Sequence, residues 1–218
     1  MKKSIILYLN NDEIFTFPIA YYLIKKLSAK YNIFIKLGNS SLKKKIKIIL
    51  IFLLDGSIKK LPKFYYKRIS IDKLLFEKNV KIYKETNEYE YAFGLSINYP
   101  KKISNTKLDI YNFHFGNFKD QRGTFIFFYK NLYNWLNIDL SFHKINNKLD
   151  SGKIINKKTI NVKKMDAINM ISIPLKNMNF YLKSIFKIGK KIKKVKTKIG
   201  PLNREPSFLK IISFFMKV

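Results

Sequence analysis

The sequence alternates short apolar runs with amphipathic segments, and this alternation constrains the fold more than any other feature. Every fourth residue from Phe15 to Leu27 is apolar, so these side chains form one row along a helix. Strands are expected at residues 5–10, 32–37, 80–84, 91–96, 110–115 and 140–145, with a weaker one at 153–160. Helices are expected at residues 15–27, 42–54, 71–76, 125–136 and 165–186. Strands that alternate with helices predict a three-layer α/β fold, with a mostly parallel central sheet and helices on both faces.

The composition fits one folded domain with a buried core. Of the 218 residues 47% are hydrophobic and 16% are aromatic, which excludes a chain that is disordered for lack of apolar residues. The absence of cysteine excludes disulfide scaffolds, cysteine-ligated zinc, iron–sulfur clusters and thiol nucleophiles.

The apolar segments are too short for targeting or for spanning a membrane. The opening MKKSIILYLNND holds an apolar run about half as long as that of a secretory signal, so we interpret it as a buried first strand. The longest apolar stretch, residues 46–54, is well short of the ~20 residues that span a bilayer. We therefore predict a cytoplasmic protein without a transmembrane segment, and attachment to a membrane surface stays open.

The charge is strongly positive, with 44 Lys and Arg against 14 Asp and Glu, a net charge of +30. Such a charge attracts nucleic acids, but recognition of phosphate and bases favours arginine, and this chain has only Arg68, Arg122 and Arg204. We therefore favour a solvated lysine surface over nucleic-acid binding. The lysine-rich stretch 187–198 has two interpretations: it binds RNA or an anionic membrane, or it is a solvated helix end.

The common glycine and histidine motifs are absent. No GxGxxG or GxxxxGK[ST] motif occurs, so the glycine loops that hold phosphates in dinucleotide and P-loop proteins are missing. The GxSxG and HExxH motifs are also missing, and with two histidines in the chain a site of several histidines around a metal is not expected.

One polar group remains at the end of an expected strand. Asn112 and His114 are two residues apart in the strand 110–115, so both side chains face the same side. After the strand 140–145 follows the polar loop NNKLDSG, which carries Asp150. An amide, an imidazole and a carboxylate together suit acyl transfer, because the first two stabilise an oxyanion and the third sets the protonation of the imidazole.

The order and spacing of these segments resemble a known family. The run NFHFGNFKDQRG, followed by SFHKINNKLDSGKII, is similar to the motifs of 10-formyltetrahydrofolate-dependent formyltransferases. The preceding GLSINYPKKI resembles the strand and folate-binding loop of that family. The specific resemblance covers residues 88–160 and implies a Rossmann-like formyltransferase fold.

The resemblance also implies roles for particular residues. Asn112, His114 and Asp150 correspond to the catalytic residues of the family, and His143 to a second histidine that we interpret as structural. The co-substrate is then 10-formyltetrahydrofolate, and no metal is required. The residues expected to bind it are Tyr99, Pro100, Lys102, Asn146, Asn147 and Leu149. We expect Arg122 and Gly123, at the start of a helix, to bind the acceptor substrate.

The acceptor depends on the branch of the family. Ser96-Ile97-Asn98-Tyr99 is similar to the sugar N-formyltransferases, which modify nucleotide-linked amino sugars for surface polysaccharide. Phosphoribosylglycinamide formyltransferase, methionyl-tRNA formyltransferase and a non-catalytic basic binding module remain alternatives. We expect residues 1–186 to form the catalytic domain and residues 187–218 a basic tail that packs on the domain or forms a homodimer contact.

Overall fold

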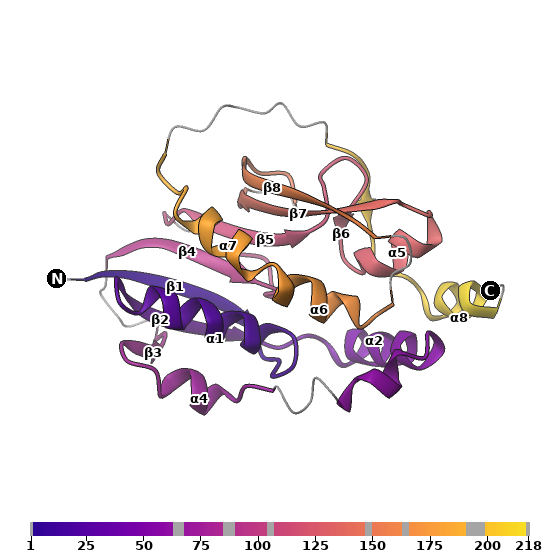
Figure 1. Cartoon of the computed structure of the whole chain (residues 1–218), viewed down its shortest axis with the longest axis horizontal. Helices are drawn as coiled ribbons and strands as arrows, with labels where there is room; N and C mark the ends of the chain where they lie inside the picture. The colour runs from indigo at the N-terminus through magenta and orange to yellow at the C-terminus, as the bar shows by residue number, and fades with distance from the viewer. Residues whose placement is uncertain are drawn as a thin grey trace.

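The computed structural model describes residues 2–62, 68–84, 90–103, 107–146, 150–162, 166–190 and 199–216 (Figure 1). The strands of the main sheet are β1 (Lys3–Asn10), β2 (Tyr31–Gly38), β3 (Val80–Ile82), β4 (Tyr91–Ile97), β5 (Ile110–Phe115), β7 (Asn137–Lys144) and β8 (Ile154–Asn161). The helices are α1 (Thr16–Leu27), α2 (Leu42–Leu54), α4 (Ile71–Leu75), α5 (Ile126–Leu132), α6 (Asn169–Lys176), α7 (Met178–Ile185) and α8 (Phe208–Met216), with a 3-10 turn η1 (Ser57–Lys60).

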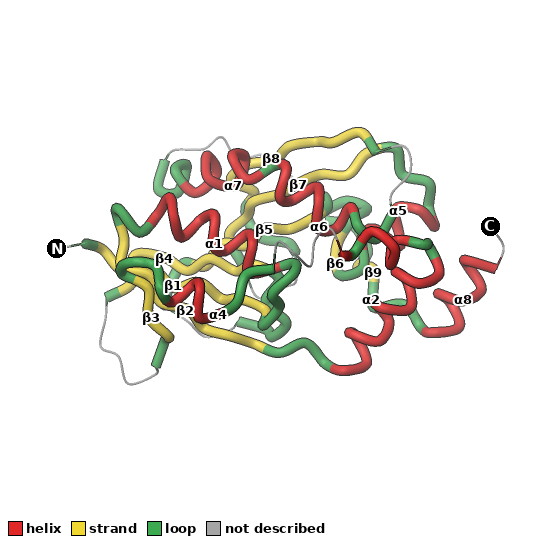
Figure 2. Tube along the Cα trace, turned by 60° about the horizontal axis from the view of Figure 1, so that its bottom comes forward, coloured by secondary structure: helices red, strands yellow, loops and turns green. Residues whose placement is uncertain are grey.

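The seven strands form one sheet in the order β3-β2-β1-β4-β5-β7-β8. The first five strands in this order, from β3 at the edge to β5, run parallel to one another. Strand β7 runs antiparallel to both of its neighbours, β5 and β8. Figure 2 shows this sheet running through the molecule with helices along it. The predicted α/β fold with a mostly parallel central sheet is confirmed.

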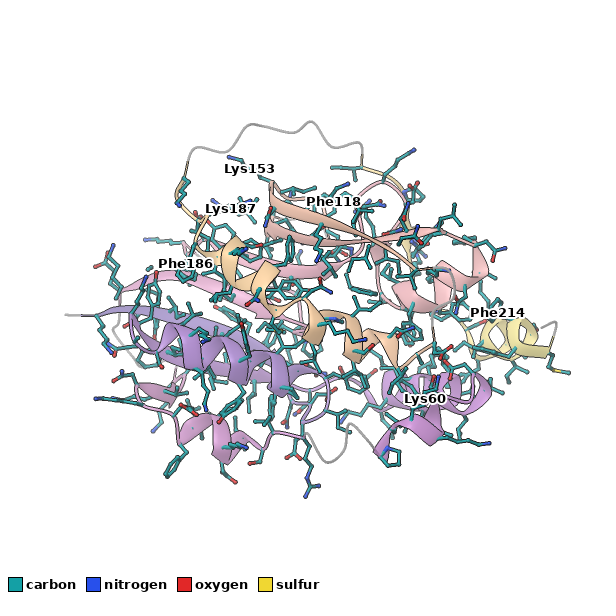
Figure 3. The ribbon with its side chains drawn as sticks, viewed as in Figure 1. Lys60, Phe118, Lys153, Phe186, Lys187 and Phe214 are labelled. Atoms are coloured by element: carbon teal, nitrogen blue, oxygen red, sulfur yellow. The ribbon has the colours of Figure 1, made fainter. Side chains whose placement is uncertain are left out.

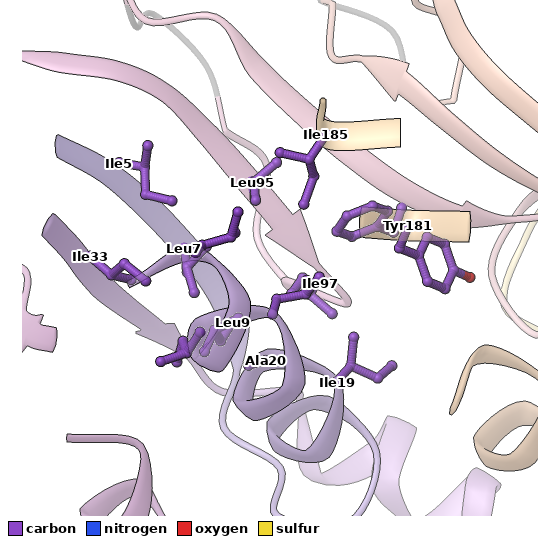
Figure 4. Close-up of a cluster of buried hydrophobic side chains, with 14 of the residues drawn as sticks. Ile5, Leu7, Leu9, Ile19, Ala20, Ile33, Leu95, Ile97, Tyr181 and Ile185 are labelled. Carbon is purple, nitrogen blue, oxygen red and sulfur yellow. The ribbon is translucent and has the colours of Figure 1, made fainter. Parts of the chain in front are cut away.

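The core lies between the sheet and the helices α1 and α7 (Figure 4). Alternate residues of β1 turn to these helices, and Ile5, Leu7 and Leu9 are fully buried there. The residues between them, Ile6 and Tyr8, are buried on the other face of the sheet. Burial on both faces explains why the sequence of β1 is apolar without alternation.

The prediction of one long helix at residues 165–186 is wrong, because two helices, α6 and α7, occupy this region. Pro174 lacks the N–H that the helix ladder needs, and Asn177 has φ −111° and ψ 22°. The Asn177 side chain donates to the Ile173 carbonyl at 2.8 Å, which ends α6 before α7 begins.

The prediction that Arg122 and Gly123 lie at the start of a helix is also wrong. Arg122 and Gly123 form the short strand β6, which pairs in parallel with β9 (Leu202–Asn203). Helix α5 begins only at Ile126, after Phe125 in the left-handed conformation. The partner strand is distant in the sequence, which explains why the local pattern did not reveal it.

The C-terminal helix α8 packs against α2 and α5, at the end of the molecule marked C in Figure 1. Ile211 is fully buried, and the rings of Phe214 and Phe128 lie 5.3 Å apart. Lys47 of α2 is buried and donates to Glu205, just before α8, at 2.7 Å. In the part of the chain described, no helix is long and apolar enough to cross a membrane.

Candidate active site

Strand β5 presents Asn112 and His114 on the face of the sheet opposite α1 and α7. Phe113, between them, faces the core, where its ring lies 4.5 Å from that of Tyr181 on α7. Tyr111 stacks on Phe142 of β7 at 5.6 Å. This packing fixes the strand, so the two polar side chains are held by a rigid support.

The antiparallel pairing of β5 and β7 adds a second imidazole to the site. Asn112 stands opposite His143, and His114 stands opposite Ser141. The Asn112 side-chain nitrogen Nδ2 lies 3.3 Å from His143 Nε2.

Asp150 completes the cluster from the loop between β7 and β8. Its Oδ1 lies 3.4 Å from His114 Nδ1 and 3.7 Å from His143 Nε2, and its Oδ2 accepts from the Gly123 N–H at 2.9 Å. Asp150 has φ 44°, a left-handed conformation that aspartate tolerates better than most residues. The carboxylate is 5% exposed, so its contacts are shielded from water.

His143 is neutral at neutral pH. Burial, helped by the neighbouring His114, lowers the pKa of His143 to about 4, although Asp150 and the Lys144 carbonyl oppose the shift. Nδ1 lies 3.1 Å from the Lys144 carbonyl oxygen and must be the donor in that bond. Nε2 is then the acceptor for an N–H of Asn112, which leaves the second amide N–H of Asn112 for another partner.

His114 has an acceptor at each ring nitrogen. Nε2 donates to the Gln121 carbonyl at 2.7 Å, whereas Nδ1 faces the Asp150 carboxylate. A bare Nδ1 and a bare carboxylate would repel each other, so the contact is attractive only with a proton between them. The imidazole and carboxylate form a buried pair that is joined through Nδ1.

Two further residues support His114, and the sequence interpretation missed their roles. The buried Gln121 accepts the N–H of Asn117 and that of Asp139, both at 3.2 Å, and so fixes the segment that binds His114. Gly116 has φ 149°, and a Cβ there would collide with the Gln121 carbonyl and lie 2.8 Å from His114 Nε2. The sequence signal for this close contact was the glycine directly after the strand that carries Asn112 and His114.

Phe118 covers the two imidazoles. Its ring lies 4.8 Å from that of His143 and 6.2 Å from that of His114, and it is 1% exposed (Figure 3). Asn112 is less buried than His114 and Asp150, so it forms the accessible side of the cluster.

Arg122 and Gly123 hold the Asp150 loop in place. Arg122 Nε donates to the Asp150 carbonyl at 3.1 Å, and its Nη1 donates to the Gly200 carbonyl. The Gly123 N–H binds the Asp150 carboxylate, as given above. The acceptor contacts expected of these two residues remain predictions.

The residues expected to bind folate lie in two places. Tyr99 and Pro100 follow β4 and pack against Gly38 at the end of β2, and the Tyr99 ring lies 5.4 Å from that of Tyr8. Lys102 is exposed nearby. Asn146 accepts from the Ser151 hydroxyl at 2.8 Å, which ties together the two ends of the Asp150 loop. Asn147 and Leu149 lie outside the described residues.

The comparisons with known proteins support the fold. No family model matches the sequence, and no curated protein matches it by sequence. WlaRD, a sugar 3N-formyl transferase, gives a TM-score of 0.62 at 19% identity, over 94% of this chain and 69% of WlaRD. The chain has the formyltransferase fold.

Two further solved structures give the same result. The N-formyltransferase of Helicobacter canadensis gives a TM-score of 0.63 at 16% identity, over 94% of this chain and 71% of that one. Methionyl-tRNA formyltransferase of Clostridium thermocellum gives 0.55 at 12% identity, over 95% of this chain and 74% of that one. At such identities the likeness establishes the formyltransferase fold, whereas the reaction must be argued from the site.

Proposed function

We propose that this chain is an enzyme that transfers a formyl group from 10-formyltetrahydrofolate to the primary amine of a nucleotide-linked sugar. The observation that carries the proposal is the cluster of Asn112, His114 and Asp150, in which an amide donor lies beside a buried imidazole and a buried carboxylate in contact with each other. The predicted cytoplasmic location and the use of the product in surface polysaccharide are part of this proposal.

The chemistry needs an oxyanion donor and a proton carrier. The acceptor amine forms a bond to the formyl carbon, which places negative charge on the formyl oxygen. The amide N–H of Asn112 that His143 does not use is the group available to stabilise this oxygen. His143, held neutral by its low pKa, keeps the amide turned for this task.

The proton then moves from the amine to the leaving group. The tetrahedral intermediate collapses when the bond between the formyl carbon and folate N10 breaks, and N10 takes up a proton. The pair of His114 and Asp150 accepts the proton that the attacking nitrogen loses and returns it to N10. Atoms and charge balance without a covalent enzyme intermediate.

The folate is assigned to the loop that follows β4. The backbone near Tyr99, Pro100 and Lys102 offers donors and acceptors to a pterin edge, and Lys102 is exposed for a carboxylate. WlaRD was crystallised with 5-N-formyl-THF, and the Helicobacter canadensis enzyme with folinic acid. The same two structures contained dTDP and dTDP-3-aminofucose, which favours a nucleotide-linked amino sugar as acceptor.

A formyl-transfer assay tests the proposal. Release of tetrahydrofolate is followed with nucleotide-linked amino sugars, glycinamide ribonucleotide and charged initiator tRNA as acceptors. We expect turnover with an amino sugar, and a loss of about 10²–10⁴-fold in Asp150→Asn, which keeps the shape but cannot carry the proton. Lys81→Gln, a change at an exposed position on β3, is the matched control and should keep full activity.

Folate binding separates the two parts of the proposal. Binding of 10-formyltetrahydrofolate without turnover on an amino sugar would refute the proposed acceptor. A folded protein that binds no folate at all would refute formyl transfer itself.

A further inference from the structure

Helix α2 exposes an apolar stripe on the side that faces away from the core. Leu42, Ile46, Ile49 and Leu53 lie at helical spacing and are 73%, 46%, 54% and 54% exposed. The opposite side of α2 is also apolar, since Ile51 and Phe52 are 1% exposed. A surface helix normally turns its only apolar stripe inward, so the outer stripe of α2 needs another explanation.

Helix α8 adds exposed apolar side chains at the same end of the molecule. Its inner residues pack on α2 and α5, whereas Leu209 and Met216 are 76% and 82% exposed. Lys47 connects the two helices, because it binds Glu205 and its Nζ lies 5.2 Å from the centre of the Phe208 ring. Figures 1 and 2 both place α2 and α8 at the same end of the molecule. We call these six exposed side chains the α2–α8 surface: Leu42, Ile46, Ile49, Leu53, Leu209 and Met216.

Lysines are the main charged side chains beside the α2–α8 surface, with Asp55 directly after α2 and Glu205 shortly before α8 as acidic neighbours. Lys43 and Lys45 are exposed and lie about 100° and 60° around the helix from the row of Leu42, one on each flank. The sequences of α2 and α8 contain no Asp or Glu. Lys59 and Lys60 of η1 are exposed beyond the end of α2, and Lys60, labelled in Figure 3, pairs with Asp166.

This combination fits an anionic lipid surface. An apolar stripe flanked by lysines inserts its side chains at the boundary of headgroups and acyl chains, while the lysines meet lipid phosphates. A second copy of the chain is disfavoured, because a two-fold contact places the same lysine flanks near each other in a protein of net charge +30. With 13 residues, α2 is too short to cross a bilayer but long enough to lie in its plane.

We propose that the α2–α8 surface binds the chain to anionic membranes. The proposal does not rest on formyl transfer, because the surface contains none of the residues of the candidate active site. Its consequence is that this protein works at a lipid surface while its fold stays outside the bilayer.

Flotation with lipid vesicles tests the proposal on the full chain. Vesicles of phosphatidylcholine alone are compared with vesicles that also contain phosphatidylglycerol. We expect binding to the anionic vesicles and at least tenfold weaker binding to the neutral ones. The double variant Ile46→Ser, Ile49→Ser should bind at least tenfold more weakly, and Phe76→Ser, which removes a 93% exposed ring on another helix end, should bind like the wild type.

Variants of the lysines provide a second test in the same vesicle-binding experiment. One lysine near an anionic surface contributes about 1 kcal/mol, so Lys43→Gln should weaken binding about fivefold, whereas Lys81→Gln on β3 should have a smaller effect. Equal losses in both lysine variants, with no loss in the double Ile variant, would show attraction by net charge alone and overturn the proposal. Absence of vesicle binding, together with a dimer that the double Ile variant dissociates, would assign the surface to a second copy and overturn it as well.

Discussion

Mild acid is expected to destabilise the fold through His143. The side chain is 2% exposed, and burial with the nearby His114 lowers its pKa from 6.5 to about 4. In the unfolded chain the imidazole is in water and takes up a proton near its ordinary pKa. The unfolded state therefore binds more protons between pH 6.5 and pH 4, so the contribution of His143 to stability is complete above pH 6.5 and is lost as the pH falls towards 4.

The size of the effect follows from the shift in pKa. One pKa unit corresponds to about 1.4 kcal/mol, so the interval from 6.5 to about 4 gives roughly 3 kcal/mol for the complete loss. About 2 kcal/mol of this loss is reached at roughly pH 5, where the unfolded imidazole is charged and the folded one is not. This is a large part of the stability of an ordinary domain, about 5–15 kcal/mol.

Urea unfolding at neutral pH and near pH 5 measures this loss. Other groups also titrate in this interval, so the comparison is with His143→Gln, which keeps an acceptor for Asn112 but does not titrate. The wild type should lose about 2 kcal/mol more than the variant on acidification. An equal loss in the two proteins would refute the assignment of a buried neutral His143.

Three further predictions concern the site and its supports. Asn112→Ala should lower kcat for formyl transfer by about 10²–10³-fold with little change in the Kd of folate, measured by steady-state kinetics and by titration, because an oxyanion donor acts in the transition state. Gly116→Ala should destabilise the fold by about 1–3 kcal/mol in thermal unfolding, and by more than Gly56→Ala, since both glycines have a positive φ but only Gly116 has no space for a Cβ. A chain that ends at residue 186 should unfold at least ~4 °C lower, because it loses buried Ile211 and the Gly200 carbonyl that binds Arg122; an unchanged Tm would show that residues 187–218 form a separate tail.

Local pattern was enough to predict most of the elements that carry the site. The strand Ile110–Phe115 and the helix Leu42–Leu54 were predicted with the bounds that the structure has. The strand expected at residues 140–145 begins at Asn137, because pairing with β8 extends it beyond its apolar part. Asn177 ends α6 with a side-chain bond to a carbonyl, and a hydrophobic pattern contains no information about such a bond.

The supports of the site depend on contacts between distant segments. Gln121 binds His114 through its main-chain carbonyl, which any residue type possesses, so its sequence identity gives no signal. Arg122 and Gly123 form a strand only because Leu202 and Asn203 lie beside them. Of the lysine-rich stretch, Lys187 and Lys190 are described and exposed, and Lys187 binds Asn156 at 2.8 Å; the remaining lysines lie outside the described residues.

The direction of β7 explains where the cluster lies. In a fully parallel sheet, polar residues after neighbouring strands meet at the carboxyl edge. Here Asn112 pairs with Ser96 on one side and with His143 of antiparallel β7 on the other, which places it within the sheet and not at its edge. The Asp150 loop must therefore fold back over the face of the sheet, and the left-handed Asp150, bound by Gly123 and Arg122, makes that return. A carboxylate held in this way is shielded from water and lies against the imidazole of His114, with that of His143 slightly farther away, which suits the proton transfer proposed beside the amide of Asn112.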